Sequence, residues 1–458
     1  MTTDRRKFIS SLLGCSLAAS AKPLEQSPPS RLPNFVLFLA DDLGYGDLSC
    51  YGSKIQTPNL DRMAAEGVHL EEFYAFPTCT PSRAALLTGR YPLRSGLVRV
   101  LAPREHFGIT DAEITLGQAL QSLGYATACI GKWHLGDFIR YGPNRHGFDY
   151  FYGLHYSNDM TLPAVDWPPL RLYRNEKVIE SPARQDTLTQ RYTQQAIEFI
   201  EGNKNRPFFL YLPDTMPHVP LAVSSGFRGK SSYGLYGDAV EEIDWGVGQI
   251  MALLRTRELD QNTLTIFTSD NGPAIRTRFV AHAGSAGPLR GGKGTTWEGG
   301  TRVPCIARWQ GHIPGGAKLK GIASLLDILP TFVRAANGSL PSDRVIDGKP
   351  LLDFLEMKAP SHNHEFFYYS GRRLFAARVD DWKVHFIKRK RGPRGHLSTP
   401  VYCRPPELYN LAKDPGEQHD VASEHANVVK RLSGIALDFQ SKMIPGKLPP
   451  PFWETFLP

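Results

Sequence analysis

The chain has 458 residues, of which 41% are hydrophobic, 21% charged and 11% aromatic. This much apolar material can bury a sizeable core, which excludes a disordered or low-complexity protein. The 53 Lys and Arg residues outnumber the 45 Asp and Glu residues, giving a net charge of +8. Spread over this length, the excess fits a soluble basic protein better than a nucleic-acid-binding one and favours an anionic substrate. The length predicts a large globular body of enzyme size.

The first 21 residues are expected to be an export signal. Residues 5–7 (Arg-Arg-Lys) precede a short apolar run, and residues 19–21 (Ala-Ser-Ala) supply a small-residue cleavage site. The arginine pair resembles a twin-arginine export motif, which predicts a bacterial protein located in the periplasm or secreted. A competing interpretation takes residues 12–15 as a lipoprotein box, with anchoring through Cys15. Removal of residues 1–21 would lower the net charge to +6.

Residues 22–358 have the pattern of a large α/β domain. Short apolar runs bounded by turns alternate with helical patterns, which is typical of βα units that bury parallel strands. The expected strands are 34–40, 125–130, 207–212 and 264–268. The expected helices are 58–66, capped by Thr57, and 114–123, 186–202, 236–259 and 324–337. A Gly-rich stretch, 284–300, precedes the last helix.

Residues 359–458 are expected to form a smaller C-terminal α+β subdomain, with a boundary near residue 358. Strands 365–369, 374–379 and 382–387 follow one another as an antiparallel meander, and Asp380-Asp381 makes one of its turns. The basic segment 388–396 is expected to be a solvated loop. The alternatives for that segment are contact with a polyanionic substrate and binding of nucleic acid.

Polar residues that could form one site follow four of the expected strands. In open α/β sheets, ligands bind beyond the carboxyl ends of the parallel strands. One acidic pair is most often a turn or a cap, but two pairs at matching strand ends favour a site for Ca²⁺ or Mg²⁺. Lysine and histidine side chains also follow these strands, and Arg83 and Lys293 add two more cations. Such a set suits the binding of an anionic tetrahedral group. The strand-end residues are Asp41 and Asp42, then Lys132 and His134, then His218, then Asp270 and Asn271.

Six cysteines lie far apart and show no CxxC pair, so they predict neither a zinc site nor a disulfide framework. Alone, Cys79 would be interpreted as a small buried hydrophobic residue. It begins the run Cys79-Thr80-Pro81-Ser82-Arg83, followed by AALLTGR at 84–90. This run resembles the signature of the type I sulfatases, in which a modifying enzyme converts the cysteine to formylglycine.

The resemblance to the arylsulfatase A-like group extends over nearly the whole mature chain. It implies the fold of the alkaline phosphatase superfamily, a large mixed and mostly parallel sheet flanked by helices. It also implies a smaller C-terminal domain built on an antiparallel sheet. The further matching stretches are 40–52 (ADDLGYGDLSCYG), 57–67 (TPNLDRMAAEG), 131–136 (GKWHLG), 269–273 (SDNGP), 291–304 (GGKGTTWEGGTRVP) and 408–417 (LYNLAKDPGE).

The resemblance also implies a set of site residues. A Ca²⁺ ion, in preference to Mg²⁺, would bind to Asp41, Asp42, Asp270, Asn271 and an oxygen of modified residue 79. Residues at the catalytic and sulfate-holding positions are Arg83, Lys132, His134, His218 and Lys293. Ser157 falls where the family has a substrate-contacting serine, and the loops 98–106 and 276–282 would shape the substrate pocket.

The activity implied is hydrolysis of a sulfate ester, of a sulfated small molecule or glycan, to alcohol and inorganic sulfate. The hydrated aldehyde would present two hydroxyls on one carbon, and sulfate would dock at the helix that begins at Thr80-Pro81. His218 is expected to be the general acid and His134 the base. The partners implied are a sulfated substrate and the formylglycine-generating enzyme, with no nucleic acid. The alternatives are a phosphonate or phosphate monoester hydrolase and a catalytically silent protein that binds sulfated glycans.

Overall fold

A computed structural model describes residues 32–161, 167–275, 284–389 and 397–443. The expected signal at residues 1–21, with Cys15, lies outside these ranges, as do the loop 276–282 and residues 390–396 of the basic segment. The described helices and strands lie in one compact unit that begins at Leu32.

The four strands expected from the sequence form the centre of a large sheet. β8 (Thr263–Ser269), β1 (Asn34–Ala40), β7 (Phe208–Pro213) and β3 (Ala126–Lys132) are neighbours in that order, and all four are parallel. Every residue of these strands is buried. Strands covered on both faces carry nearly continuous apolar runs, which explains why the sequence pattern located them.

Further strands extend this sheet at both sides and make it mixed. β9 (Arg302–Arg308) is antiparallel to both β8 and β2 (Val68–Tyr74). β9 and β2 were not expected from the sequence. Glu71 and Glu72 interrupt the apolar run of β2, and Pro304 lies inside β9, where proline argues against a central strand. The remaining strands of the sheet are β10 (Ala317–Leu319) and β11 (Ala323–Ser324) beside β2, and β4 (Tyr150–Leu154), β5 (Leu172–Arg174) and β6 (Lys177–Glu180) beyond β3.

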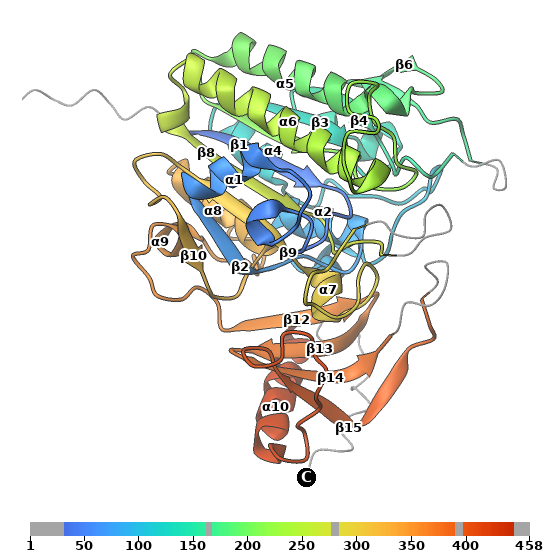
Figure 1. Ribbon diagram of the computed structural model, residues 1–458, viewed down its shortest axis with the longest axis vertical. Coiled ribbons are helices and arrows are strands. Elements are labelled where there is room, and N and C mark those ends of the chain that lie inside the picture. Colours follow the sequence, from blue (N-terminus) through green and yellow to red (C-terminus); the bar gives the residue numbers. More distant parts are fainter. Residues whose placement is uncertain (1–31, 162–166, 276–283, 390–396, 444–458) are drawn as a thin grey trace, which may run out of the picture. The chain divides into compact units, whose positions relative to one another are not determined.

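Helices cover both faces of the large sheet, and successive residues of β1 enter different cores. Phe35, Leu37 and Leu39 join one core, whereas Val36 and Phe38 join the other. This alternation follows from the two-residue period of a strand. The first core is closed by α2 (Cys79–Thr88), α4 (Leu116–Ser122) and α8 (Ile328–Ala335), and the second by α1 (Pro58–Ala65), α5 (Leu188–Asn203) and α6 (Gly234–Thr256) (Figure 1).

The helices begin and end within a few residues of the expected positions. Thr57 precedes α1 as expected, but its hydroxyl accepts a hydrogen bond from Ser49 N at 3.0 Å and does not cap the helix. α4 starts with a capping box between Thr115 and Gln118. The expected helix 324–337 is shorter, because a 3₁₀ turn at Leu325–Asp327 precedes α8. None of the described helices combines the length and apolarity that a bilayer span requires.

The C-terminal region contains a second sheet of four antiparallel strands in sequence order. β12 (Glu365–Ser370), β13 (Arg373–Val379) and β14 (Trp382–Lys388) confirm the expected meander. β15 (Val401–Asn410) and α10 (Ala426–Met443) were not expected, and α10 contributes Leu432, Ala436 and Met443 to the core on this sheet. The domain boundary near residue 358 stays a prediction. The short helices are α3 (Pro92–Ser95), α7 (Glu298–Thr301) and α9 (Leu352–Leu355).

A buried charge network, formed by Glu298, Lys383, His385 and Glu417, lies between α7 and the C-terminal sheet. Lys383 Nζ lies 2.9 Å from Glu298 Oε1 and 3.0 Å from Glu417 Oε1. His385 Nε2 lies 2.7 Å from the same Glu417 oxygen, and all four side chains are fully buried. Burial alone would raise the pKa of Glu298, but Lys383 and two arginines outweigh it and hold the pKa at about 2. The network therefore ties the segment that contains α7 to the C-terminal sheet.

We expect Lys383→Met to lower the free energy of unfolding by about 3–5 kcal/mol, because it leaves buried carboxylates without their cation. Urea denaturation measures this change. The matched control is Lys413→Met, since Lys413 is exposed, and it should change stability by less than about 0.5 kcal/mol. Equal effects of the two substitutions would contradict a stabilising network.

Candidate active site

The carboxyl ends of the four central strands bring most of the expected site residues together. Two backbone hydrogen bonds fix this edge of the sheet: Asp270 N donates to Ala40 O at 3.1 Å, and Asp41 N donates to Met216 O at 3.2 Å. The site residues are Asp41 and Asp42 directly after β1, Lys132 at the end of β3, His218 beyond β7, and Asp270 and Asn271 directly after β8.

Two buried cations pair with two buried carboxylates in the site. Lys132 Nζ lies 2.5 Å from Asp41 Oδ2. Arg83 donates to Asp270 Oδ2 from Nε at 3.0 Å and from a terminal nitrogen at 2.8 Å. All four side chains are fully buried, so each charge needs its partner. Burial would raise the pKa of Asp41, but Lys132 and its other cationic neighbours hold the pKa far below its usual range.

Asp42 and Asn271 present oxygens that lack a donor among the described residues. Asp42 Oδ1 accepts from Asn271 Nδ2 at 2.8 Å and lies 2.6 Å from Lys293 Nζ. Asp42 Oδ2 and Asn271 Oδ1 are both buried without a hydrogen-bond partner. Asp42 also has a φ of 66°, a left-handed conformation that is strained for a residue with a side chain. Orphaned oxygens held in a strained loop fit a site for a hard cation.

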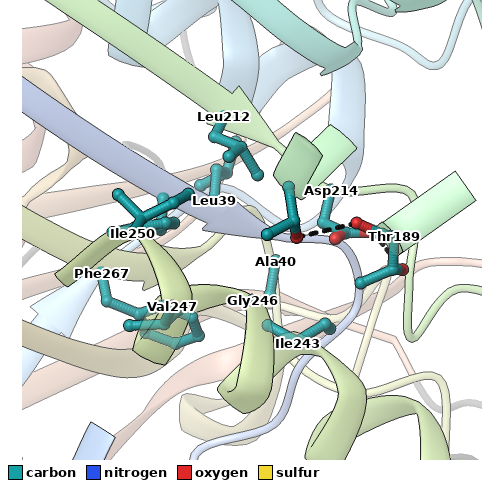
Figure 2. Close-up of a pocket in the computed structure, with 12 residues that line it drawn as sticks. Leu39, Ala40, Thr189, Leu212, Asp214, Ile243, Gly246, Val247, Ile250 and Phe267 are labelled. Atoms are coloured by element: carbon teal, nitrogen blue, oxygen red, sulfur yellow. Dashed lines mark hydrogen bonds between the residues drawn. The ribbon is translucent and has the colours of Figure 1, made fainter. Parts of the chain in front are cut away.

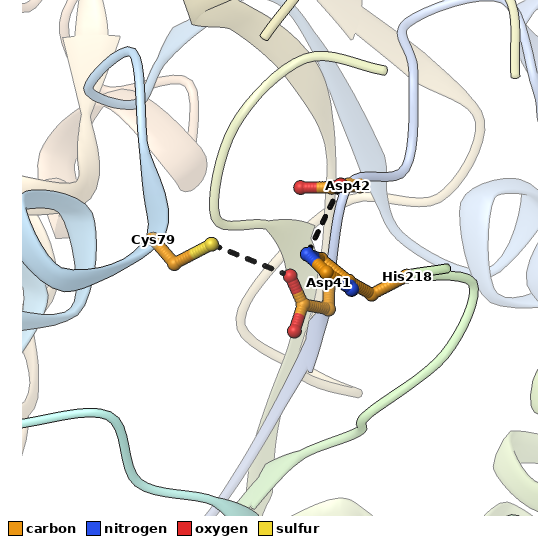
Figure 3. A group of neighbouring side chains, drawn as sticks. All are labelled: Asp41, Asp42, Cys79 and His218. Carbon is orange, nitrogen blue, oxygen red and sulfur yellow. Dashed lines mark hydrogen bonds and ion pairs between the residues drawn. The ribbon is translucent and has the colours of Figure 1, made fainter. Parts of the chain in front are cut away.

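Cys79 is the first residue of α2 and is buried against these carboxylates. Its Sγ lies 3.6 Å from Asp41 Oδ1, and His218 Nε2 lies 3.6 Å from Asp42 Oδ2 (Figure 3). One ligand atom from each of Asp41, Asp42, Cys79 and His218 lies within 4.8 Å of the others. The Asp270 carboxylate contacts Arg83 and accepts from Asp42 N at 3.2 Å. The cluster therefore contains His218, which was expected to be catalytic, near the expected metal ligands.

The other polar residues of the Cys79 signature position their surroundings. Thr80 Oγ1 donates to the His134 carbonyl at 2.9 Å. Ser82 Oγ accepts from Phe76 N at 3.0 Å and holds the turn that leads into the helix. Arg83 also donates to the Lys132 carbonyl at 2.5 Å. These contacts of Thr80 and Ser82 were not predicted, because their partners are not apparent from the motif.

His134 is held as a neutral imidazole with one free nitrogen. Its Nε2 lies 3.0 Å from the Leu101 carbonyl, which can only accept, so this nitrogen carries the proton. Nδ1 is buried and has no hydrogen-bond partner in the part of the chain that the structure describes, which leaves its lone pair available. Burial lowers the pKa of His134 well below its usual value, and Lys132 and Arg83 lower it further. His134 has a φ of 60°, so its backbone is strained as well.

Ser157 and Asn158 lie beside His218. His218 Nδ1 contacts Val219 O at 2.6 Å and Asn158 Oδ1 at 3.0 Å; both are acceptors, so Nδ1 carries a proton and Nε2 faces the site. Ser157 Oγ lies 3.1 Å from Lys132 Nζ and 3.4 Å from His218 Nε2. The structure thus brings Ser157 into the cluster. Asn158 orients His218 and was not identified from the sequence.

Comparison with known proteins gives the family. Residues 33–339 match the family described as Sulfatase, and residues 361–448 match the C-terminal region of aryl-sulfatase. The chain is 36% identical to the steryl-sulfatase of Homo sapiens, over 94% of this chain and 92% of that protein. It is 37% identical to the N-acetylgalactosamine-6-sulfatase of Sus scrofa, over 94% of this chain and 90% of that one.

The chain belongs to the sulfatase family. The solved structure of PsFucS1 sulfatase from Pseudoalteromonas sp. is similar to it, with a TM-score of 0.83 and 32% sequence identity. That similarity covers 91% of this chain and 92% of the other. The expected fold, a large mixed sheet flanked by helices with a separate antiparallel sheet, is confirmed, and the chain is a sulfuric ester hydrolase.

Asp47 is a further residue of this sulfatase that supports the site. Its carboxylate accepts from Gly44 N at 2.7 Å, from Tyr236 OH at 2.6 Å and from Ser285 N at 2.8 Å. Burial raises the pKa of Asp47 to about 7. These bonds connect the loop after β1 to α6 and to the Gly-rich segment. The matching stretch 40–52 contains Asp47, but its role depends on partners that are distant in the sequence.

A small apolar pocket lies between the sheet and helices α5 and α6 of the sulfatase (Figure 2). Asp214 is the titratable residue that lines it, and its carboxylate accepts from Met216 N at 2.9 Å and from Thr189 Oγ1 at 3.3 Å. The cavity volume of about 10 Å³ is enough for roughly one water molecule. This pocket is a gap in the core that is too small for a substrate.

We expect Ser157→Ala to lower kcat/KM for 4-nitrophenyl sulfate roughly tenfold, because it removes a hydrogen bond to the Lys132 ammonium. Steady-state kinetics measures this loss, and circular dichroism checks the fold. Ser122→Ala, on the exposed surface of α4, is the control and should leave kcat/KM unchanged. A Ser157→Ala enzyme within twofold of the unaltered one would exclude a role for this hydroxyl.

Proposed function

We propose that this sulfatase hydrolyses the sulfate ester of a sulfated carbohydrate, with residue 79 converted to formylglycine and a Ca²⁺ ion bound at the strand ends. The observation that carries the proposal is the position of Cys79, at a helix start and 3.6 Å from the Asp41 carboxylate. The basic net charge of the chain suits an anionic substrate. The N-acetylgalactosamine-6-sulfatase of Sus scrofa is, by its name, a sulfatase of a sugar.

The environment of Cys79 supports its conversion. Burial raises the pKa of the Cys79 thiol to about 12, so the unmodified residue would hold almost no thiolate at neutral pH. A thiol that attacked sulfur would also leave a covalent adduct that needs a separate hydrolysis. The hydrated aldehyde supplies two hydroxyls on one carbon, one to attack sulfur and one to allow release of the sulfate.

The donor set supports a Ca²⁺ ion. Asp41, Asp42, Asp270, Asn271 and an oxygen at residue 79 would hold it, and the orphaned oxygens of Asp42 and Asn271 are suited to this task. Carboxylate and amide oxygens are the ligands that Ca²⁺ prefers, and Mg²⁺ is the second choice. When bound, the ion would polarise the sulfuryl oxygens and lower the pKa of the attacking hydroxyl.

The remaining residues bind sulfate and move protons. Lys132 and Lys293 would hold the sulfuryl oxygens, together with the N–H groups at the start of α2. Arg83 orients Asp270 and the end of β3, as its hydrogen bonds indicate. His218, as the imidazolium with a proton on each ring nitrogen, would give its Nε2 proton to the leaving alcohol. His134 Nδ1, with its free lone pair, would accept a proton from a hydroxyl at residue 79.

The proposal includes a maturation partner and a location. The formylglycine-generating enzyme would read the Cys79–Arg83 signature before the site closes. Export through the signal at residues 1–21 would place the enzyme in the periplasm or outside the cell, and anchoring through Cys15 is the alternative.

Cys79→Ala should reduce sulfate release from 4-nitrophenyl sulfate to the level of the uncatalysed reaction, because no nucleophile remains. Its thermal unfolding midpoint should stay close to that of the unaltered protein. Peptide mass spectrometry of protein made together with the modifying enzyme should show formylglycine at residue 79. An active Cys79→Ala protein, or a residue 79 that stays cysteine in active enzyme, would refute the mechanism.

Removal of divalent cations should lower both activity and stability. Because a ligand that binds only the folded state stabilises it, saturating Ca²⁺ should add about 2–4 kcal/mol and raise the unfolding midpoint of the chelator-treated protein. Asn271→Ala should diminish this rise, and Asp343→Asn, at an exposed carboxylate, should not. Full turnover in rigorously metal-free protein would exclude the ion.

A further inference from the structure

A second pocket lies beside the start of α2, between the α2 region and the hairpin of the C-terminal sheet. Its cavity volume of about 270 Å³ is close to that of small-ligand pockets. Thr78 and Pro81, which line it, lie on either side of Cys79, and Gly294 follows Lys293. Tyr369 and Gly371 contribute from the end of β12 and the turn after it. The pocket therefore adjoins the proposed reaction centre.

The described lining of this pocket is positively charged. It contains Arg99 and Arg389 and no Asp or Glu. Arg99 has a partner, since its guanidinium donates to both Glu105 oxygens, at 2.9 and 2.5 Å. Arg389 differs: its side chain is half-buried, its Nε is enclosed without a hydrogen-bond partner among the described residues, and its guanidinium lies 5.6 Å from the Phe375 ring. An enclosed N–H donor without an acceptor is costly, and an anion in the pocket would supply an acceptor for Arg389.

Arg389 is also connected to the segment that contains Lys293. Trp297 Nε1 donates to the Arg389 carbonyl at 3.1 Å, and Gly294 N donates to Pro77 O at 2.7 Å. These bonds fix the pocket wall to the loop of the reaction centre. An anionic group bound by Arg389 would therefore have a defined position relative to the ester that reacts.

We propose that this pocket binds a second anionic group of the substrate, a carboxylate or sulfate on the same sugar chain, with Arg389 as its principal ligand. The inference rests on the proposed function, because it assigns the substrate to the multiply charged carbohydrates. A sterol sulfate has one anionic group and would leave Arg389 without an acceptor. The pocket thus selects for charge beyond the scissile sulfate.

Equilibrium binding to the Cys79→Ala protein tests this without any need for turnover. The probes are three disaccharides that contain N-acetylgalactosamine 6-sulfate. One carries a free uronate carboxylate, one has this carboxylate as its methyl ester, and one is the methyl ester with a second sulfate. Calorimetry gives the Kd of each probe for three proteins: Cys79→Ala alone, Cys79→Ala with Arg389→Met, and Cys79→Ala with Arg431→Met. Arg431→Met is the control, because Arg431 is an exposed arginine of α10.

The Cys79→Ala protein without a further substitution should bind at least one of the two twice-charged probes more tightly than the once-charged probe. Arg389→Met should weaken that binding at least tenfold and change the Kd of the once-charged probe less than threefold, while Arg431→Met changes neither. The probe that responds identifies the carboxylate or the second sulfate as the ligand. Equal losses for all probes, no loss, or no preference in the Cys79→Ala protein without a further substitution would overturn the proposal. Absence of turnover in the unaltered enzyme would contradict the proposed function instead.

Discussion

The burial of three carboxylates at one edge of a parallel sheet, each paired with a buried or half-buried cation, is the constraint on which this structure depends. Removing an ion from water costs several kcal/mol, so each charge must be paired where it lies. The pairs are Lys132 with Asp41, Arg83 with Asp270, and Lys293 with Asp42. Because each pair joins different elements, the order β8-β1-β7-β3 and the position of α2 are fixed together. The site is therefore rigid before a substrate arrives, as electrostatic catalysis requires.

The C-terminal sheet participates in this arrangement through the segment after Gly291. Lys293 N donates to Pro273 O at 2.9 Å, and Glu298, five residues later, is held by Lys383 of β14. The same segment contacts Arg389 through Trp297. The smaller sheet thus supports one catalytic cation and contributes a wall to the neighbouring pocket.

The sequence predicted the centre of the fold and the meeting of the strand-end residues, but not the contacts that support them. The strands of residues 34–40 and 264–268 were predicted because buried parallel strands are continuously apolar. Ligands bind beyond the carboxyl ends of such strands, so Asp41 and Asp270, which follow them, were expected to lie together. β2 was not predicted because Glu71 and Glu72 interrupt its apolar run, and β9 was not predicted because it contains Pro304. The roles of Asp47 and Glu298 depend on partners 189 and 85 residues away, and no local pattern specifies such partners.

The central claim, that the site hydrolyses sulfate esters, is tested most directly with 4-nitrophenyl sulfate and 4-nitrophenyl phosphate, which differ only in the group transferred. The enzyme, made together with the modifying enzyme and supplied with Ca²⁺, should have a kcat/KM for the sulfate at least about tenfold above that for the phosphate, a difference of about 1.4 kcal/mol. A higher kcat/KM for the phosphate, or hydrolysis of neither ester, would contradict the account.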